Sequence, residues 1–128
     1  MILVDSDVLI AHLRGVAAAR DWLMDANATE GLAISVLTIT EISGGMRSGE
    51  RAQVWRLLTS LESEPVTYSI ARRAGELMRT WHRSHNGISV VDYLIAATAM
   101  ELGFSLATLN VKHYPMFSGL TPPFTLSS

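Results

Sequence analysis

The sequence has no cysteine, only 4 prolines and 9 glycines among its 128 residues, and a single lysine, Lys112. Without cysteine there is no disulfide framework and no thiolate metal site. The low proline and glycine content, together with 48% hydrophobic residues, is typical of a packed globular chain rather than a disordered one. We therefore expect a single folded domain over residues 1–128.

Long apolar runs are also missing. Charged or polar residues interrupt every apolar run before it reaches the roughly 20 residues that a membrane helix needs. Residues 1–5 lack the basic stretch and the cleavage pattern of a secretory signal. These features predict a soluble cytoplasmic protein that does not bind membranes.

A strong charge of one sign is absent, because 10 Lys and Arg residues face 12 Asp and Glu residues for a formal net charge of -2. A polyanionic partner would therefore need a local basic surface. Arg72, Arg79 and Arg83 share one face of a predicted helix, which either contacts RNA or is solvated.

Short apolar runs alternate with helical periodicities along the chain. The predicted strands cover residues 2–4, 33–37, 66–68 and 105–109, with a possible edge strand at 121–126. The predicted helices cover residues 8–13, 16–28, 51–61, 70–85 and 91–102, and one more starts near residue 38. This alternation predicts an α/β fold: a three-layer α/β/α sandwich with a mainly parallel sheet of four or five strands.

Oxygen-bearing side chains follow the predicted strands. Asp5 follows the first strand, Glu41 lies one helical turn after the second, Asp92 opens a late helix, and Asn110 follows the strand after it. In parallel sheets, sites gather at the carboxyl ends of the strands, so these side chains are expected to converge. Clustered carboxylates repel one another unless a cation neutralises them, and Mg²⁺ or Mn²⁺ is suited to hard oxygen ligands. The pattern predicts hydrolysis of a phosphodiester.

Each of these residues also has a structural alternative. Asp5 could cap the helix that follows it, and residues 38–41 and 89–92 both resemble capping boxes. Asn110 could be a loop residue that stabilises a turn. Only the joint pattern distinguishes a functional site from a set of helix caps.

Four segments resemble the PIN-domain ribonuclease family, particularly its VapC-type toxins. They are residues 2–10 (ILVDSDVLI), 38–42 (TITEI), 91–99 (VDYLIAATA) and 107–114 (ATLNVKHY). They occur in the order of the family and together span nearly the whole chain. The resemblance implies a parallel sheet between helices, with Asp5, Glu41 and Asp92 as an acidic cluster around Mg²⁺ or Mn²⁺ that Asn110 completes.

The resemblance further implies a metal-dependent endoribonuclease, the toxin component of a type II toxin–antitoxin system. Its partners would be an RNA substrate, a cognate VapB-type antitoxin and a second copy of the chain. By hypothesis Asp5 and Asp92 bind the metal, Asn110 does so directly or through water, and Glu41 positions or deprotonates the attacking water. Many relatives carry aspartate in place of Asn110, and Asp7, where relatives often have asparagine, partly restores the charge.

Two other functions remain open at this stage. Asp5 and Asp7 fit the Asp-x-Asp nucleophile motif of haloacid-dehalogenase-type phosphatases, although that chemistry usually needs a lysine and a later acidic pair. The chain could also be a catalytically silent PIN-like module that binds RNA or a protein. No role is assigned to His113.

Overall fold

A four-stranded parallel sheet runs through the middle of the computed structural model, which describes residues 1–126. The strands are β1 (Ile2–Val4), β2 (Leu32–Ser35), β3 (Glu62–Glu64) and β4 (Ser105–Ala107). Their order across the sheet is β3-β2-β1-β4, and all three neighbouring pairs are parallel. The predicted domain also includes residues 127–128, which lie outside the described residues.

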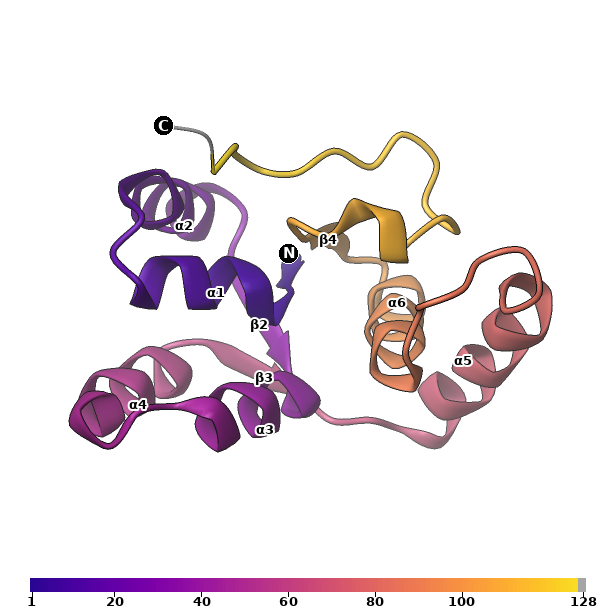
Figure 1. The fold of residues 1–128 in the computed structure, drawn as a ribbon, viewed down its shortest axis with the longest axis horizontal. Coiled ribbons are helices and arrows are strands. Elements are labelled where there is room, and N and C mark those ends of the chain that lie inside the picture. Colours follow the sequence, from indigo (N-terminus) through magenta and orange to yellow (C-terminus); the bar gives the residue numbers. More distant parts are fainter. Residues whose placement is uncertain (127–128) are drawn as a thin grey trace.

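Helices cover both faces of this sheet. They are α1 (Ser6–Leu13), α2 (Ala17–Thr29), α3 (Val36–Gly45), α4 (Arg51–Thr59), α5 (Tyr68–Trp81) and α6 (Val90–Leu102), with short 3₁₀ helices η1 (Ser48–Glu50) and η2 (Val111–His113). Helices α1 to α4 lie on one side of the sheet and α6 on the other, with α5 outside α6 (Figure 1). The predicted three-layer α/β/α sandwich is therefore confirmed.

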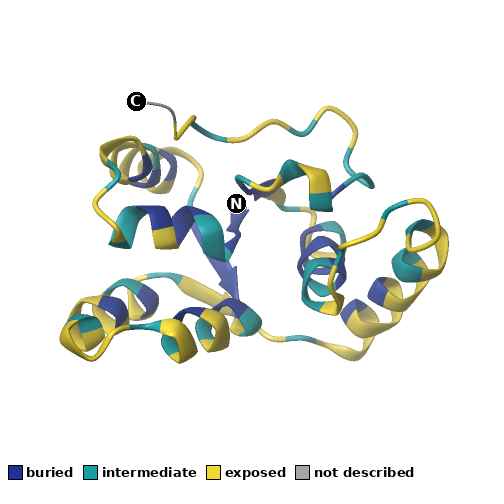
Figure 2. Cartoon of the chain, viewed as in Figure 1, coloured by how far each residue is buried: buried dark blue, intermediate teal, exposed yellow. Residues whose placement is uncertain are grey.

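The two layers of helices follow from the alternation of side chains along β1. Ile2 and Val4 pack in one cluster with α1 to α4, whereas Leu3 packs in a second cluster with α6. Figure 2 shows the buried residues concentrated in β1 and β2 and on the inward helix faces. Burying one such aliphatic side chain contributes about 1.5–3 kcal/mol, so the central strand is a main source of stability.

Helix α6 begins and ends where the sequence predicts. The Ser89 side chain accepts from the backbone N–H of Asp92, and the Asp92 side chain accepts from that of Ser89, which is a complete capping box. Gly103 ends the helix in the left-handed region, at φ 68°. Among residues 1–126, no helix has the length and apolarity to cross a membrane.

The predicted strand at residues 66–68 is wrong. The third strand is Glu62–Glu64, and Tyr68 already begins α5, which ends at Trp81 rather than at residue 85. This strand lies at the edge of the sheet and is largely exposed, so it has no apolar pattern for the sequence to display.

Helix α3 begins earlier than predicted, which shortens the strand before it. Ser35 ends β2 and caps α3, because its hydroxyl accepts from the N–H of Leu37. The capping box predicted at residues 38–41 is therefore wrong, since Thr38 lies inside the helix. The edge strand predicted at residues 121–126 is also wrong: the chain forms no strand there, and Pro122 and Pro123 cannot donate to a ladder.

Candidate active site

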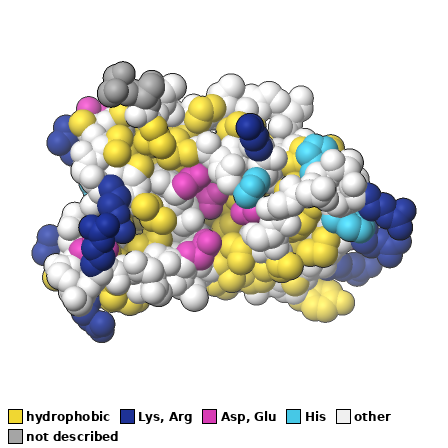
Figure 3. Space-filling model, viewed as in Figure 1, with side chains coloured by type: hydrophobic (Ala, Val, Ile, Leu, Met, Phe, Trp, Pro, Cys, Tyr) yellow, Lys and Arg dark blue, Asp and Glu magenta, His cyan; other side chains and the backbone are white. Residues whose placement is uncertain are grey.

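The candidate site lies where β1 meets its two neighbours at their carboxyl ends. Strand β1 lies between β2 and β4, and the chain crosses one face of the sheet after β1 and the other face before β4. Such a reversal of direction opens a crevice between the strands. Asp5 follows β1 directly, and acidic side chains gather near the centre of the face seen in Figure 3.

Asp5 is fixed by three donors. Its side chain is buried, and its Oδ1 accepts from the Ser6 N–H at 2.9 Å, as the capping alternative predicts. Its Oδ2 lies 2.8 Å from the Tyr114 hydroxyl and 2.9 Å from the Thr108 hydroxyl. The carboxylate is thus held in one orientation by residues from the segment after β4.

Asp7 has one satisfied oxygen and one unsatisfied oxygen. Its Oδ2 accepts from the Leu109 N–H at 3.0 Å and lies 3.2 Å from the Thr108 hydroxyl, whose single proton is shared with Asp5. Its Oδ1 is buried without a partner among the described residues. Burial, and then the neighbouring charge of Asp5, raise the pKa of Asp7 above its usual value.

Asp92 lies in the first turn of α6 and combines capping with a place in the site. Its Oδ2 accepts from the Ser89 N–H at 3.0 Å and lies 2.9 Å from Nδ1 of His113. Its Oδ1 lies 3.4 Å from the Tyr114 hydroxyl, which also donates to Asp5. The capping alternative is confirmed, yet it occupies only one of the two oxygens.

Glu41 extends from α3 toward the same cluster. Its pKa is raised, first by partial burial of the carboxylate and then by the charges of Asp5 and Asp92, although the residue as a whole is exposed. A hydrogen bond with the Ser6 side chain opposes this shift. The site therefore gathers Asp5, Asp7, Glu41 and Asp92 closely enough for their charges to repel one another.

Asn110 is turned toward His113 rather than toward the carboxylates. Its side-chain nitrogen Nδ2 lies 2.9 Å from Nδ1 of His113, the same ring atom that contacts Asp92. Nδ1 donates to Asp92 only when it is protonated and accepts from the Asn110 amide only when it is not, so the two hydrogen bonds exclude each other. The proposed role of Asn110 as a ligand stays a prediction.

Comparison with known proteins identifies the family. The PIN domain family model matches residues 2–114. Ribonuclease VapC10 of Mycobacterium tuberculosis is 62% identical over 126 residues, covering 98% of this chain and 95% of that protein. The chain belongs to the PIN-domain family, among the VapC-type proteins.

Two further matches span the full fold. Ribonuclease VapC19 of Mycobacterium tuberculosis is 42% identical over 125 residues, covering 97% of this chain and 100% of that protein. A solved toxin-antitoxin complex from Klebsiella pneumoniae matches with a TM-score of 0.77 at 25% identity, covering 97% of this chain and 98% of that one. Membership in the PIN family removes the support for a haloacid-dehalogenase-type phosphatase.

Several residues of this PIN site were not predicted from the sequence. Thr108 and Tyr114 contact the carboxylates, and Ser6 contacts both Asp5 and Glu41. Their only sequence signal is that they lie in the first and last of the four segments that resemble the family. Periodicity and charge carry no information about a buried hydroxyl.

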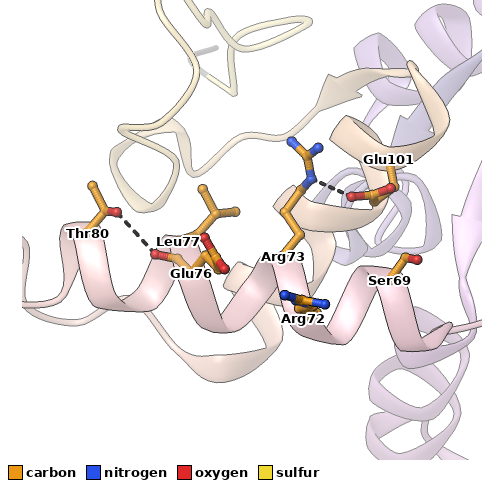
Figure 4. A pocket seen from close by; sticks show the side chains of 7 residues that line it. All are labelled: Ser69, Arg72, Arg73, Glu76, Leu77, Thr80 and Glu101. Carbon is orange, nitrogen blue, oxygen red and sulfur yellow. Dashed lines mark hydrogen bonds and ion pairs between the residues drawn. The ribbon is translucent and has the colours of Figure 1, made fainter.

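A separate cavity of about 510 Å³ lies between α5 and α6 (Figure 4). Its charged lining consists of Arg72, Arg73, Glu76 and Glu101, so positive and negative side chains balance, and Arg73 is paired with Glu101. None of the four clustered carboxylates lines it. It is therefore distinct from the candidate active site of the PIN domain.

The carboxylate cluster has the chemistry of a divalent-cation site. The unpartnered Oδ1 of Asp7 and the mutual repulsion felt by Glu41 are both relieved by a cation. As the side chains lie, no three His, Asp or Glu residues among residues 1–126 form a complete ligand set. Mg²⁺ commonly uses only one or two carboxylates and keeps several waters, so a site that uses Asp5 and Asp92 fits this requirement.

Proposed function

We propose that this chain is a metal-dependent endoribonuclease that hydrolyses RNA phosphodiester bonds, as the toxin component of a type II toxin–antitoxin system. The observation that carries the proposal is the convergence of Asp5, Asp7, Glu41 and Asp92, from three separate segments, near the carboxyl end of β1. The likeness to two VapC ribonucleases supports RNA as the substrate.

We assign Mg²⁺ as the cofactor, with Mn²⁺ as a substitute, held by Asp5 and Asp92 and completed by Asn110 directly or through water. The cation would neutralise charge on the attacked phosphate and lower the pKa of a water molecule. Oδ1 of Asp5 accepts only from the Ser6 N–H, and Oδ1 of Asp92 has only a 3.4 Å contact with the Tyr114 hydroxyl. The room left on these two oxygens supports the assignment.

We assign Glu41 the role of general base, which accepts a proton from the attacking water. Its raised pKa makes it a better proton acceptor than an ordinary glutamate, and its charge interacts with those of Asp5 and Asp92. Water oxygen forms the new bond to phosphorus, its proton passes to Glu41, the bond to the leaving oxygen breaks, and that oxygen takes a proton from solvent.

The test is cleavage of total RNA by the purified chain, with Mg²⁺, with Mn²⁺ and with a chelator. Asp5→Asn and Asp92→Asn should each lower the cleavage rate at least 100-fold, because asparagine keeps hydrogen-bond acceptance but loses the charge. Asp25→Asn, on the exposed side of α2, is the control and should cleave normally. A folded Asp92→Asn variant that cleaves RNA at the normal metal-dependent rate would refute the assignment.

A catalytically silent PIN-like module is the second candidate, because the described residues lack a complete ligand set as they stand. Calorimetric titration with Mn²⁺ separates the two functions. Saturable binding of Mn²⁺ that Asp92→Asn removes supports the nuclease, whereas a silent module has no need of such binding.

We further propose a VapB-type antitoxin as the partner, a homodimer as the assembly and the cytoplasm as the compartment. The match to a toxin-antitoxin complex supports the first of these. A cognate antitoxin would abolish RNA cleavage when it is added in equimolar amount.

A further inference from the structure

Tyr114 is the one fully buried phenol that contacts the carboxylate cluster in residues 1–126. It follows η2, is 1% exposed, and packs with Leu3 and Ile95 in the cluster between the sheet and α6. A phenol carries its proton at neutral pH, so its hydroxyl acts as a donor toward a carboxylate. A buried hydroxyl normally needs a partner, and Tyr114 finds its partners on two different elements.

The Tyr114 hydroxyl bridges the end of β1 and the start of α6. It lies 2.8 Å from Oδ2 of Asp5 and 3.4 Å from Oδ1 of Asp92. Its single proton goes to the nearer oxygen, and Asp92 receives a weaker, shared contact. The hydroxyl therefore reduces the repulsion between the two carboxylates, and no other side chain among residues 1–126 hydrogen-bonds to both.

The hydrogen bond from Tyr114 leaves the two oxygens of Asp5 with different capacities to accept a further ligand. Each carboxylate oxygen accepts about two hydrogen bonds. Oδ2 is within reach of both Tyr114 and Thr108, whereas Oδ1 accepts only from the Ser6 N–H. Asp5 thus has one oxygen occupied by the protein and one with room for another ligand.

We propose that Tyr114 is a positioning residue for the divalent cation. Its hydroxyl holds Oδ2 of Asp5, so that Asp5 binds the cation through Oδ1 alone, and its weaker contact with Oδ1 of Asp92 keeps that carboxylate close to Asp5. This inference rests on the proposed metal-dependent function. Outer contacts of this kind typically change metal affinity 10–100-fold when they are removed.

Calorimetric titration of the full chain with Mn²⁺, without RNA, tests the proposal. Tyr114→Phe keeps the ring and its contact with Phe117 but removes the bridge, so we expect 10–100-fold weaker Mn²⁺ binding. In RNA cleavage, the Mn²⁺ concentration for half-maximal rate should rise by the same factor, while excess Mn²⁺ restores the rate.

Tyr93→Phe is the matched control. Tyr93 is equally buried and follows Asp92 directly, but its hydroxyl has no hydrogen-bond partner among the described residues. Its loss should leave the Mn²⁺ affinity unchanged. A folded Tyr114→Phe variant that binds Mn²⁺ as tightly as the wild type, or more tightly, would overturn the inference and leave the proposed function intact.

A second measurement needs no variant. The hydroxyl proton of Tyr114 should give a slowly exchanging NMR resonance that persists when Mg²⁺ saturates the wild-type protein. Disappearance of that resonance would mean that the hydroxyl leaves Asp5 when the metal binds, which contradicts a positioning role. A wild-type protein that binds neither Mg²⁺ nor Mn²⁺ would overturn the proposed function itself, and this inference with it.

Discussion

Asp7 lies in the first turn of α1 and holds a charge that the metal-free fold compensates poorly. Its Oδ1 is buried without a partner among residues 1–126, and Asp5 repels it. Asp7→Asn should therefore stabilise the metal-free protein by about 1 kcal/mol, a modest value because the group is partly solvated, and raise its melting temperature by roughly 3–5 °C. Differential scanning calorimetry in the presence of a chelator measures this change.

The sign of the pH dependence follows from the raised pKa of Asp7. The charged form of Asp7 is disfavoured in the folded state, so its cost to the free energy of unfolding is fully present above the folded pKa. It disappears as pH falls from the folded pKa to the usual value of 3.8, where Asp7 is protonated in both states. The gain from Asp7→Asn should shrink over that interval, and the exposed control Asp21→Asn should show no such trend. A gain that grows toward acid pH would contradict this account.

At the scale of single residues, position along the chain predicts the acids but not their partners. Asp5 and Asp92 could be predicted because each follows or opens an element at the same end of the sheet. Tyr114 and Thr108 could not, because nothing in the local sequence tells which buried hydroxyl will meet a carboxylate about a hundred positions away. Asn110 lies in the expected segment, but its side chain faces His113.

At the scale of elements, the capping box of α6 ties helix stability to the site. Ser89→Ala removes the bond to the Asp92 N–H and should cost about 1 kcal/mol of stability. It should also weaken Mn²⁺ binding, because Asp92 loses the partner that fixes its backbone. Thermal melts and Mn²⁺ titration of the same samples measure both effects.

Thr67→Ala is the matched comparison, because Thr67 caps α5 in the same way through the N–H of Ile70, and α5 holds none of the clustered carboxylates. It should lower the melting temperature by a similar amount and leave Mn²⁺ affinity alone. Equal loss of Mn²⁺ affinity in both variants would show that global destabilisation, rather than the position of Asp92, is responsible.

The elements themselves were predictable where burial gives them a pattern. Helix α6 and strand β1 have continuous or periodic apolar residues, and both were predicted nearly to the residue. Strand β3 has the sequence Glu-Ser-Glu and pairs only with β2, so its existence depends on a neighbour rather than on its own side chains. The adjacent apolar residue Val66 gave a false strand signal.

At the scale of the whole molecule, the metal and the fold should stabilise each other. Any ligand that binds only the folded state adds stability, about 2.7 kcal/mol at a hundred times its dissociation constant. Saturating Mn²⁺ should therefore raise the melting temperature by roughly 10 °C, and a chelator should reverse the effect. Asp92→Asn should abolish this shift, and a rise of the same size in that variant would mean that Mn²⁺ binds elsewhere.

The Tyr114 hydroxyl and the Asp5 carboxylate it contacts are separated by 109 positions in the chain. Because β1 pairs with β4 as well as with β2, the first strand of the described sheet has both of its neighbours only after the last strand has formed. A nascent chain emerging from the ribosome thus has the first acid long before it has the residues that hold it. For a ribonuclease, this order of assembly would delay activity until the segment that carries Tyr114 has been synthesised.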